Sequence, residues 1–208
     1  VEADRQQAWH LLSYALQTPA TWSGARTLLL ALAPKMQMAG FRHDWLAYLE
    51  QGLVAGRSAG DGQAEAALNL EIGELYRHLG QYAEAEVHFA AALGLAQQSG
   101  DRAGEAAALV CLANLACLTQ KLDEAMHLAD ATLALVVPGD PCGARAFFVK
   151  GCVFDDRNQR EDAESCFRQA QAIWALANDR RWVALCQQNL AGLAMASAQY
   201  DEAIEAYS

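Results

Sequence analysis

A short phrase recurs along the chain at a nearly constant spacing and ends each time on an alanine. These alanines are 40, 38 and 40 residues apart, at Ala85, Ala125, Ala163 and Ala203. A second mark, an acidic residue directly after a turn-forming residue, keeps the same period at Asp61, Asp101, Asp140 and Asp179. Two independent marks with one period indicate a tandem repeat protein.

Composition and charge exclude several classes of function. The chain has 208 residues, 53% of them hydrophobic, which is enough for a continuous core. No stretch approaches the roughly 18 apolar residues of a membrane helix. The net charge of −10 repels phosphate backbones. We therefore expect a soluble, cytoplasmic module that binds neither membranes nor, through this segment, nucleic acids.

The six cysteines show no Cys-x-x-Cys spacing and have no paired histidines nearby. Most fall where neighbouring repeats carry alanine, valine or leucine. The sequence therefore predicts small apolar residues in a reducing compartment, with a redox or metal role as the alternative.

Each repeat is predicted to be two antiparallel helices. In the second repeat, Asp101 is a good N-cap and strong helix formers follow it, with apolar residues on more than one face. A polar break at 119–121 precedes a second helix, in which apolar residues return every three to four positions. The prediction is an all-α fold, a right-handed α-α superhelix of helix pairs.

The repeat marks also divide the chain. We expect a leading helix over residues 3–17 and a degenerate helix pair within residues 1–60, in which Trp45 replaces the small alanine and packs against something different. The tandem repeats then occupy 61–100, 101–139, 140–178 and an incomplete 179–208, in one continuous solenoid domain. Both ends look cut, so we expect this to be a segment of a longer protein.

Small and bulky residues recur at complementary positions of the repeats. Equivalent small residues lie midway along the first helices, at Gly73, Ala113, Gly151 and Ala191. Bulky residues align in the second helices, at Phe89, Phe167 and Tyr207. This pattern predicts that the two helix backbones of each pair approach closely at the small residues.

The small-and-large pattern resembles the tetratricopeptide repeat. Residues 80–86 and 199–207 are similar to the second-helix signature of that family, and the resemblance covers residues 61–208. The longer period is similar to that of the variants in MalT-like regulators and beside bacterial signalling ATPases. Lys150 departs from the pattern because the equivalent residues are apolar, which puts the inner packing of the third repeat in question.

In a superhelix of this kind the first helices line the concave side. Aligning the repeats predicts a groove for an extended or helical peptide, lined by Glu71, Glu74, His78, Val110, Cys111, Asn114, Phe148, Val149, Cys152, Gln188 and Asn189. The alternative is that several of these side chains are buried between helices. The carboxylate-gripping specialisation of the family is not expected, because Asn114 alone fits its pattern.

We predict no catalytic residues, cofactor or metal. The five histidines are dispersed, and no phosphate loop or nucleophile motif is present. The acidic clusters at 161–164 and 201–205 fit solvated helix starts better than cation sites.

Three functions remain open. The first is a scaffold that recognises a protein or peptide without chemistry. The second is the sensor arm of a bacterial signalling ATPase or transcriptional regulator, with an attached nucleotide-binding or effector domain. The third is the substrate-recruiting arm of a protease.

Overall fold

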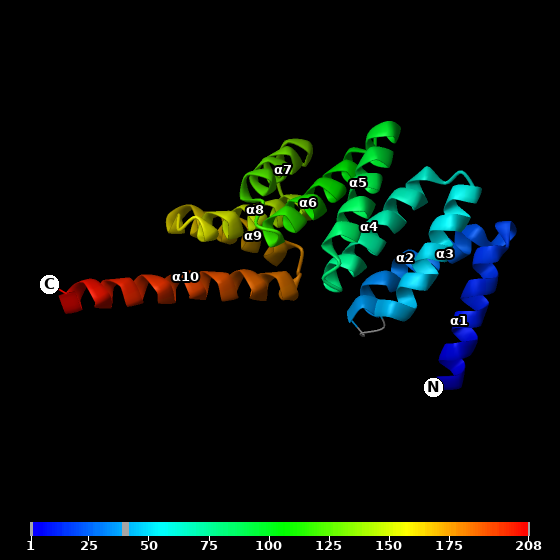
Figure 1. Ribbon diagram of the computed structural model, residues 1–208, viewed down its shortest axis with the longest axis horizontal. Coiled ribbons are helices and arrows are strands. Elements are labelled where there is room, and N and C mark those ends of the chain that lie inside the picture. The colour runs from blue at the N-terminus through cyan, green and yellow to red at the C-terminus, as the bar shows by residue number, and fades with distance from the viewer. Residues whose placement is uncertain (1, 39–41, 208) are drawn as a thin grey trace. The chain divides into compact units, whose positions relative to one another are not determined.

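The computed structural model describes residues 2–38 and 42–207, which form ten α-helices and one short 3-10 turn and contain no strand. The elements are α1 Glu2–Gln17, η1 Pro19–Thr21, α2 Trp22–Met38, α3 Arg42–Ser58, α4 Gly62–His78, α5 Tyr82–Ser99, α6 Arg102–Leu118, α7 Leu122–Leu135, α8 Pro141–Asp156, α9 Arg160–Leu176 and α10 Arg180–Tyr207. The predicted all-α class is confirmed (Figure 1).

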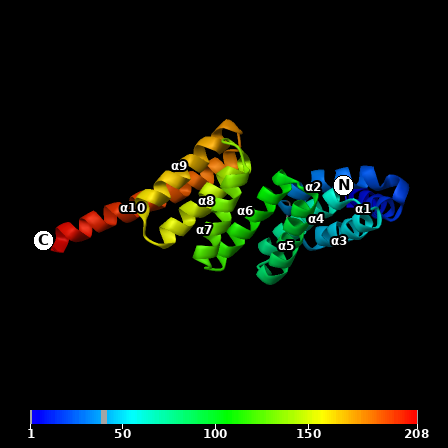
Figure 2. The same cartoon turned by 90° about the horizontal axis from the view of Figure 1, so that it is seen from above.

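The chain divides into two compact units, residues 1–111 and 112–208, with the boundary inside α6. In the first unit α4 packs along α5, and in the second α8 packs along α9 (Figures 1 and 2). These are the predicted antiparallel helix pairs. The prediction of one continuous solenoid domain stays a prediction.

Six helix connections have the same kind of turn: α3–α4, α4–α5, α5–α6, α6–α7, α8–α9 and α9–α10. A residue with positive φ ends the helix, and the next residue donates its backbone N–H to a carbonyl five positions earlier, as Asp61 does to Gly56 and Gln159 to Phe154. This is a Schellman ending, which favours glycine or asparagine at the left-handed position. Gln120 also adopts the left-handed conformation, with φ 60°. Glutamine has a Cβ, so this conformation is less favourable for it than for glycine.

The periodic acidic residues cap the first helices, as predicted. Asp101 and Asp140 each accept backbone N–H groups of the helix that follows. Asp61 does more, because its carboxylate also accepts bonds from Trp22 Nε1 at 3.0 Å and Arg26 Nη1 at 2.8 Å. Burial would raise the pKa of Asp61, but hydrogen bonds from Ala64, Trp22 and Arg26 outweigh it and hold the pKa below its usual range. Asp61 therefore ties the start of α2 to the start of α4.

The complementary small and bulky residues meet within the helix pairs. A Cβ added to Gly73 would lie 2.5 Å from the Phe89 ring, and one added to Gly151 would lie 2.6 Å from the Phe167 ring. Both phenylalanines are fully buried. The close approach inferred from the repeat alignment is confirmed in these two pairs.

The leading helix covers the bulky residue of the degenerate pair. Trp45 is fully buried, and its ring lies 5.5 Å from that of Trp9 of α1, which stacks on Tyr48 at 4.5 Å. The predicted different partner of Trp45 is therefore α1.

Lys150 does not disturb the core of the third repeat. Its Nζ donates to Asp130 Oδ1 on α7 at 2.6 Å, and the Asp130 side chain is exposed. The long side chain reaches the surface although its Cα lies on an apolar face.

The end of the chain differs from the expected incomplete pair. The repeat alignment places a second-helix start near residue 199, but α10 continues as one helix to Tyr207 and extends beyond α9 in Figure 2. The position equivalent to Gly80, Gln120 and Asn158 is Ala198. Alanine disfavours the left-handed turn and favours helix, so the sequence supplies no stop signal there. The predicted equivalence of Tyr207 with Phe89 and Phe167 falls outside the described side chains.

Candidate functional site

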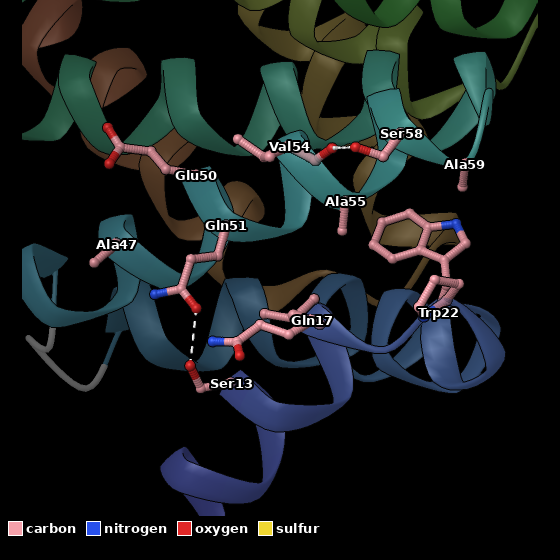
Figure 3. Close-up of a pocket in the computed structure, with 12 residues that line it drawn as sticks. Ser13, Gln17, Trp22, Ala47, Glu50, Gln51, Val54, Ala55, Ser58 and Ala59 are labelled. Atoms are coloured by element: carbon pink, nitrogen blue, oxygen red, sulfur yellow. Dashed lines mark hydrogen bonds between the residues drawn. The ribbon is translucent and has the colours of Figure 1, made fainter.

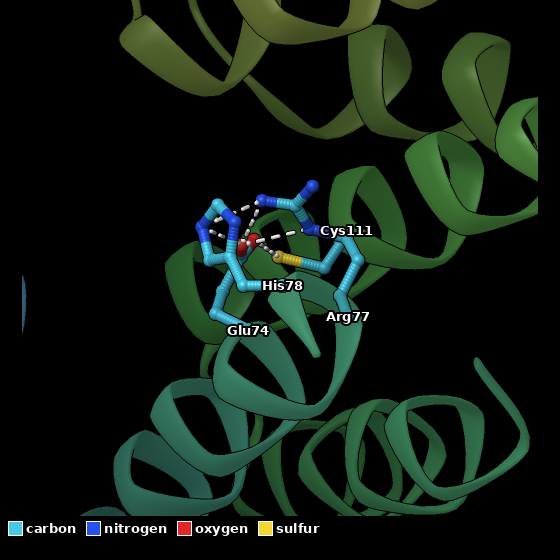
Figure 4. A network of polar contacts seen from close by, with 4 residues as sticks. All are labelled: Glu74, Arg77, His78 and Cys111. Carbon is cyan, nitrogen blue, oxygen red and sulfur yellow. Dashed lines mark hydrogen bonds and ion pairs between the residues drawn. The ribbon is translucent and has the colours of Figure 1, made fainter. Parts of the chain in front are cut away.

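In the first unit three predicted groove residues, Glu74, His78 and Cys111, form a polar network with Arg77 between α4 and α6 (Figure 4). The Glu74 carboxylate accepts two bonds from Arg77, Nε at 3.0 Å and Nη2 at 2.7 Å. Cys111 Sγ donates to the same carboxylate at 3.4 Å. Glu74, Arg77 and His78 are half-buried, so the network is held in place yet open to solvent on one side.

The ring of His78 also belongs to this network. Arg77 Nη2 lies 3.1 Å from His78 Nε2. Because a guanidinium can only donate, Nε2 accepts this bond, which leaves the ring proton on Nδ1. His78 Nε2 is 4.0 Å from Glu74 Oε2, too far for a hydrogen bond. The Glu74 and His78 side chains therefore are not arranged as an acid/base pair.

In the second unit one half-buried position recurs at equivalent places of the first helices. Asn114 of α6 and Cys152 of α8 occupy equivalent positions, and both are half-buried. Phe148 is also half-buried, but its ring packs against Phe167 at 5.4 Å and Trp182 at 5.6 Å. The Phe148 ring therefore belongs mainly to the core of the second unit.

Three predicted groove residues lie in the helix packing. Val110 is 0%, Cys111 3% and Val149 2% exposed. Their side chains have little surface for a partner, although Cys111 reaches the Glu74 network. Here the alternative weighed from the sequence, burial between helices, describes these side chains better than groove lining.

The last two predicted residues lie on α10. Gln188 is exposed, whereas Asn189 is half-buried and donates from Nδ2 to the Leu185 carbonyl at 2.9 Å. This bond uses the amide nitrogen and leaves the amide oxygen of Asn189 for a partner.

Two cavities lie away from all eleven predicted residues. One, of about 720 Å³, lies in the first unit between α1 and α3; Ser13 donates there to Gln51 at 2.9 Å (Figure 3). The other, of about 480 Å³, lies in the second unit beside the 136–139 turn and Phe147. The sequence signals for these cavities were the small residues of α3, such as Ala55 and Ser58, and the Val-Val-Pro-Gly turn after α7.

Within the part of the chain that the structure describes, no group of three or more His, Cys, Asp or Glu side chains could hold a metal ion. Among the same residues no helix is long and apolar enough to cross a membrane. The six cysteines are free thiols.

The sequence over residues 63–136, from α4 to α7, matches the model of the tetratricopeptide repeat family. This segment is similar to tetratricopeptide repeats. The resemblance inferred from the second-helix signature is confirmed, while membership of the long MalT-like variant stays a prediction. None of the curated proteins compared with the chain is similar enough in sequence to count as a relative.

Solved structures with the same fold extend beyond the matched segment. BtubC (BKLC) from P. vanneervenii has a TM-score of 0.65 and 22% identity, over 86% of this chain and 77% of that one. The TPR-like repeats assigned to a kinesin light chain of Podosopora anserina give 0.63 and 19%, over 90% and 92%. At these identities the likeness shows the TPR-like solenoid fold.

A Rap protein complexed with Competence and Sporulation Factor has a TM-score of 0.55 and 15% identity. The alignment covers 93% of this chain and 62% of the Rap chain. It adds a further example of the fold.

Proposed function

We propose that the chain is a protein-interaction scaffold that recognises a peptide or protein segment on the inner faces of its first helices. The observation that carries this proposal is a half-buried position that recurs at equivalent places of the first helices, at Glu74 in the first unit and at Asn114 and Cys152 in the second. Other side chains on these helices, such as Val110 and Val149, are buried between helices. A recurring polar position on an otherwise packed helix provides sites that fix a partner's orientation.

The charge and polarity of these positions favour a particular partner. Asn114 offers both donors and acceptors, as peptide-backbone recognition requires. The charge of Glu74 is paired with that of Arg77, through a contact of 2.7 Å. We propose an extended or helical segment with polar backbone contacts and few charges. The complex of the Rap protein with Competence and Sporulation Factor supports recognition of another molecule by this fold.

The test is selection of binders from a displayed library of random peptides, followed by affinity measurement with fluorescence anisotropy. In an Asn114→Arg variant we expect the affinity of selected peptides to fall about tenfold or more, about 1.4 kcal/mol. The matched control is His127→Arg, which adds the same side chain at an exposed position of α7.

Circular dichroism of both variants checks that helix content is retained. Equal affinity of the selected peptides for the wild type, Asn114→Arg and His127→Arg chains would show that the inner face of α6 is not the binding surface. Loss of affinity in the His127→Arg control alone would move the site to the second helices.

A further inference from the structure

A trough runs along α3 in the first unit, where α1 covers only part of that helix (Figure 3). The two helices run in the same direction, because Trp9 stacks on Tyr48 and, about one turn later, Ser13 donates to Gln51. α1 ends about one turn after Ser13, whereas α3 continues for about two turns after Gln51. α1 therefore leaves the end of α3 uncovered, and the trough of about 720 Å³ has the size of a ligand site.

One end of the trough is apolar. Ala55 and Ala59 of α3 lie beside the Trp22 indole in Figure 3, and Val54 lines the same space with an exposed side chain. The alanines are small, so they leave room above the indole. A large apolar group of a ligand would contact Trp22 and Val54 there and would be removed from water.

Two glutamine amides lie in the middle of the trough. In Figure 3 the side chains of Gln17 and Gln51 both point into the space between α1 and α3. Gln51 Oε1 accepts the bond from Ser13 at 2.9 Å, and its Nε2 remains a donor. Gln17 is exposed, so its amide can both donate and accept. These groups match the donors and acceptors of an extended peptide backbone.

The charge of the trough is acidic. Of the residues that line it, only Glu50 is charged. Glu50 accepts a bond from Tyr76 Oη at 3.3 Å, which leaves most of the acceptor capacity of the carboxylate for a ligand. Arg57, the basic residue in the last turn of α3, is paired with Glu65 at 2.7 Å. The trough therefore attracts a cation and repels an anion.

We propose that this trough binds a short basic segment of a partner protein in an extended conformation, with a large apolar residue against Trp22 and a lysine or arginine beside Glu50. The trough reaches from Ala47 to Ala59, which is ~18 Å along a helix. About five extended residues span that length. α3 is the second helix of the degenerate pair, so this surface is distinct from the inner faces of the first helices.

The test uses acetylated and amidated pentapeptides as probes, added to the whole chain labelled with nitrogen-15. One pair has leucine and lysine at its ends, in either order, with alanine and serine between them. The matched pair has glutamate in place of lysine. The Trp22 indole signal in NMR spectra reports binding. We expect one of the two basic peptides to bind about fivefold or more tighter than its acidic counterpart, because attraction to Glu50 replaces repulsion.

Matched variants assign this preference to the trough. Glu50→Gln should reduce it to less than about twofold, and Glu86→Gln, at an exposed position of α5, should leave it unchanged. Val54→Lys should weaken binding of the basic peptide about tenfold or more, because it removes an apolar contact and adds a like charge. Val87→Lys is the control: Val54 and Val87 are 63% and 68% exposed, so neither change disturbs the core.

Three results would overturn the proposal. They are equal affinity for basic and acidic peptides in both orders, a preference that persists in Glu50→Gln, and an unchanged Trp22 signal with every peptide. Binding of n-butylammonium as tightly as the basic peptide would also contradict it, because the site would then hold a small amine. Asn114→Arg lies in the second unit and should bind the probes like the wild type, so failure of this proposal and failure of the scaffold proposal are distinguishable.

Discussion

Gly73 and Phe89 offer the sharpest test of how the helix pairs are packed. A methyl group at Gly73 would lie 2.5, 2.6 and 3.1 Å from three atoms of the Phe89 ring. The ring is fully buried, so it has no free space to turn into. Gly73→Ala must therefore push α4 and α5 apart or force Phe89 out of its rotamer.

The expected cost follows from two opposing contributions. Overpacking a core costs about 1 to 3 kcal/mol, and contacts this short place Gly73→Ala in the upper half of that range. Replacing glycine by alanine inside a helix returns about 1 kcal/mol. We expect a net loss of about 1 to 2 kcal/mol in the free energy of unfolding.

The control lies in the same helix pair. Gly94 is inside α5, and an added Cβ there would meet nothing within 4 Å. Gly94→Ala should therefore stabilise the chain by about 0.5 to 1 kcal/mol. Urea unfolding followed by far-ultraviolet circular dichroism, with hydrogen exchange of α4 and α5 as a local readout, measures both variants.

A double variant identifies the cause. If the ring is the obstacle, Phe89→Leu should relieve much of the cost of Gly73→Ala, and the two changes should be far from additive. A Gly73→Ala chain as stable as Gly94→Ala, or strictly additive effects with Phe89→Leu, would refute the packing argument.

Three further predictions address other parts of the structure. Ala125 is fully buried, so Ala125→Leu should cost about 1 to 3 kcal/mol in urea unfolding, and an unchanged midpoint would contradict the repeat alignment. Gln120→Gly relieves a left-handed conformation and should raise the free energy of unfolding by about 1 kcal/mol in the same assay. Burial lowers the pKa of His88, so its contribution to stability is fully present above pH about 6.5 and is lost as pH falls through the folded-state pKa; stability measured against pH should lose this slope in His88→Gln.

The fold was largely predictable because its signals are local and repeated. The capping aspartates, the left-handed residues such as Gly80 and Gly100, and the small residues each follow from backbone geometry that a short sequence window contains. Where the local signal is missing, at Ala198, the alignment still indicated a turn and the structure has none. A repeat alignment predicts a turn at every equivalent position, including one whose own residue does not favour a turn.

The candidate site was less predictable because exposure depends on the neighbouring helices. Val110 and Asn114 lie one turn apart on the same helix, yet the first is fully buried and the second is half-buried. Periodicity assigns both to one face, and only the packed neighbours distinguish them.

The second repeat lacks the pairing of a glycine with a phenylalanine that its neighbours have. At the positions where its neighbours have Gly73 with Phe89 and Gly151 with Phe167, it has Ala113 and Ala129, both fully buried. This pair therefore has two small side chains where its neighbours have one ring against a glycine. Because the two positions face each other across the helix pair, a change at one of them is tolerated only together with a change at the other. An alignment read in pairs of positions, one on each helix, therefore describes this core better than one read position by position.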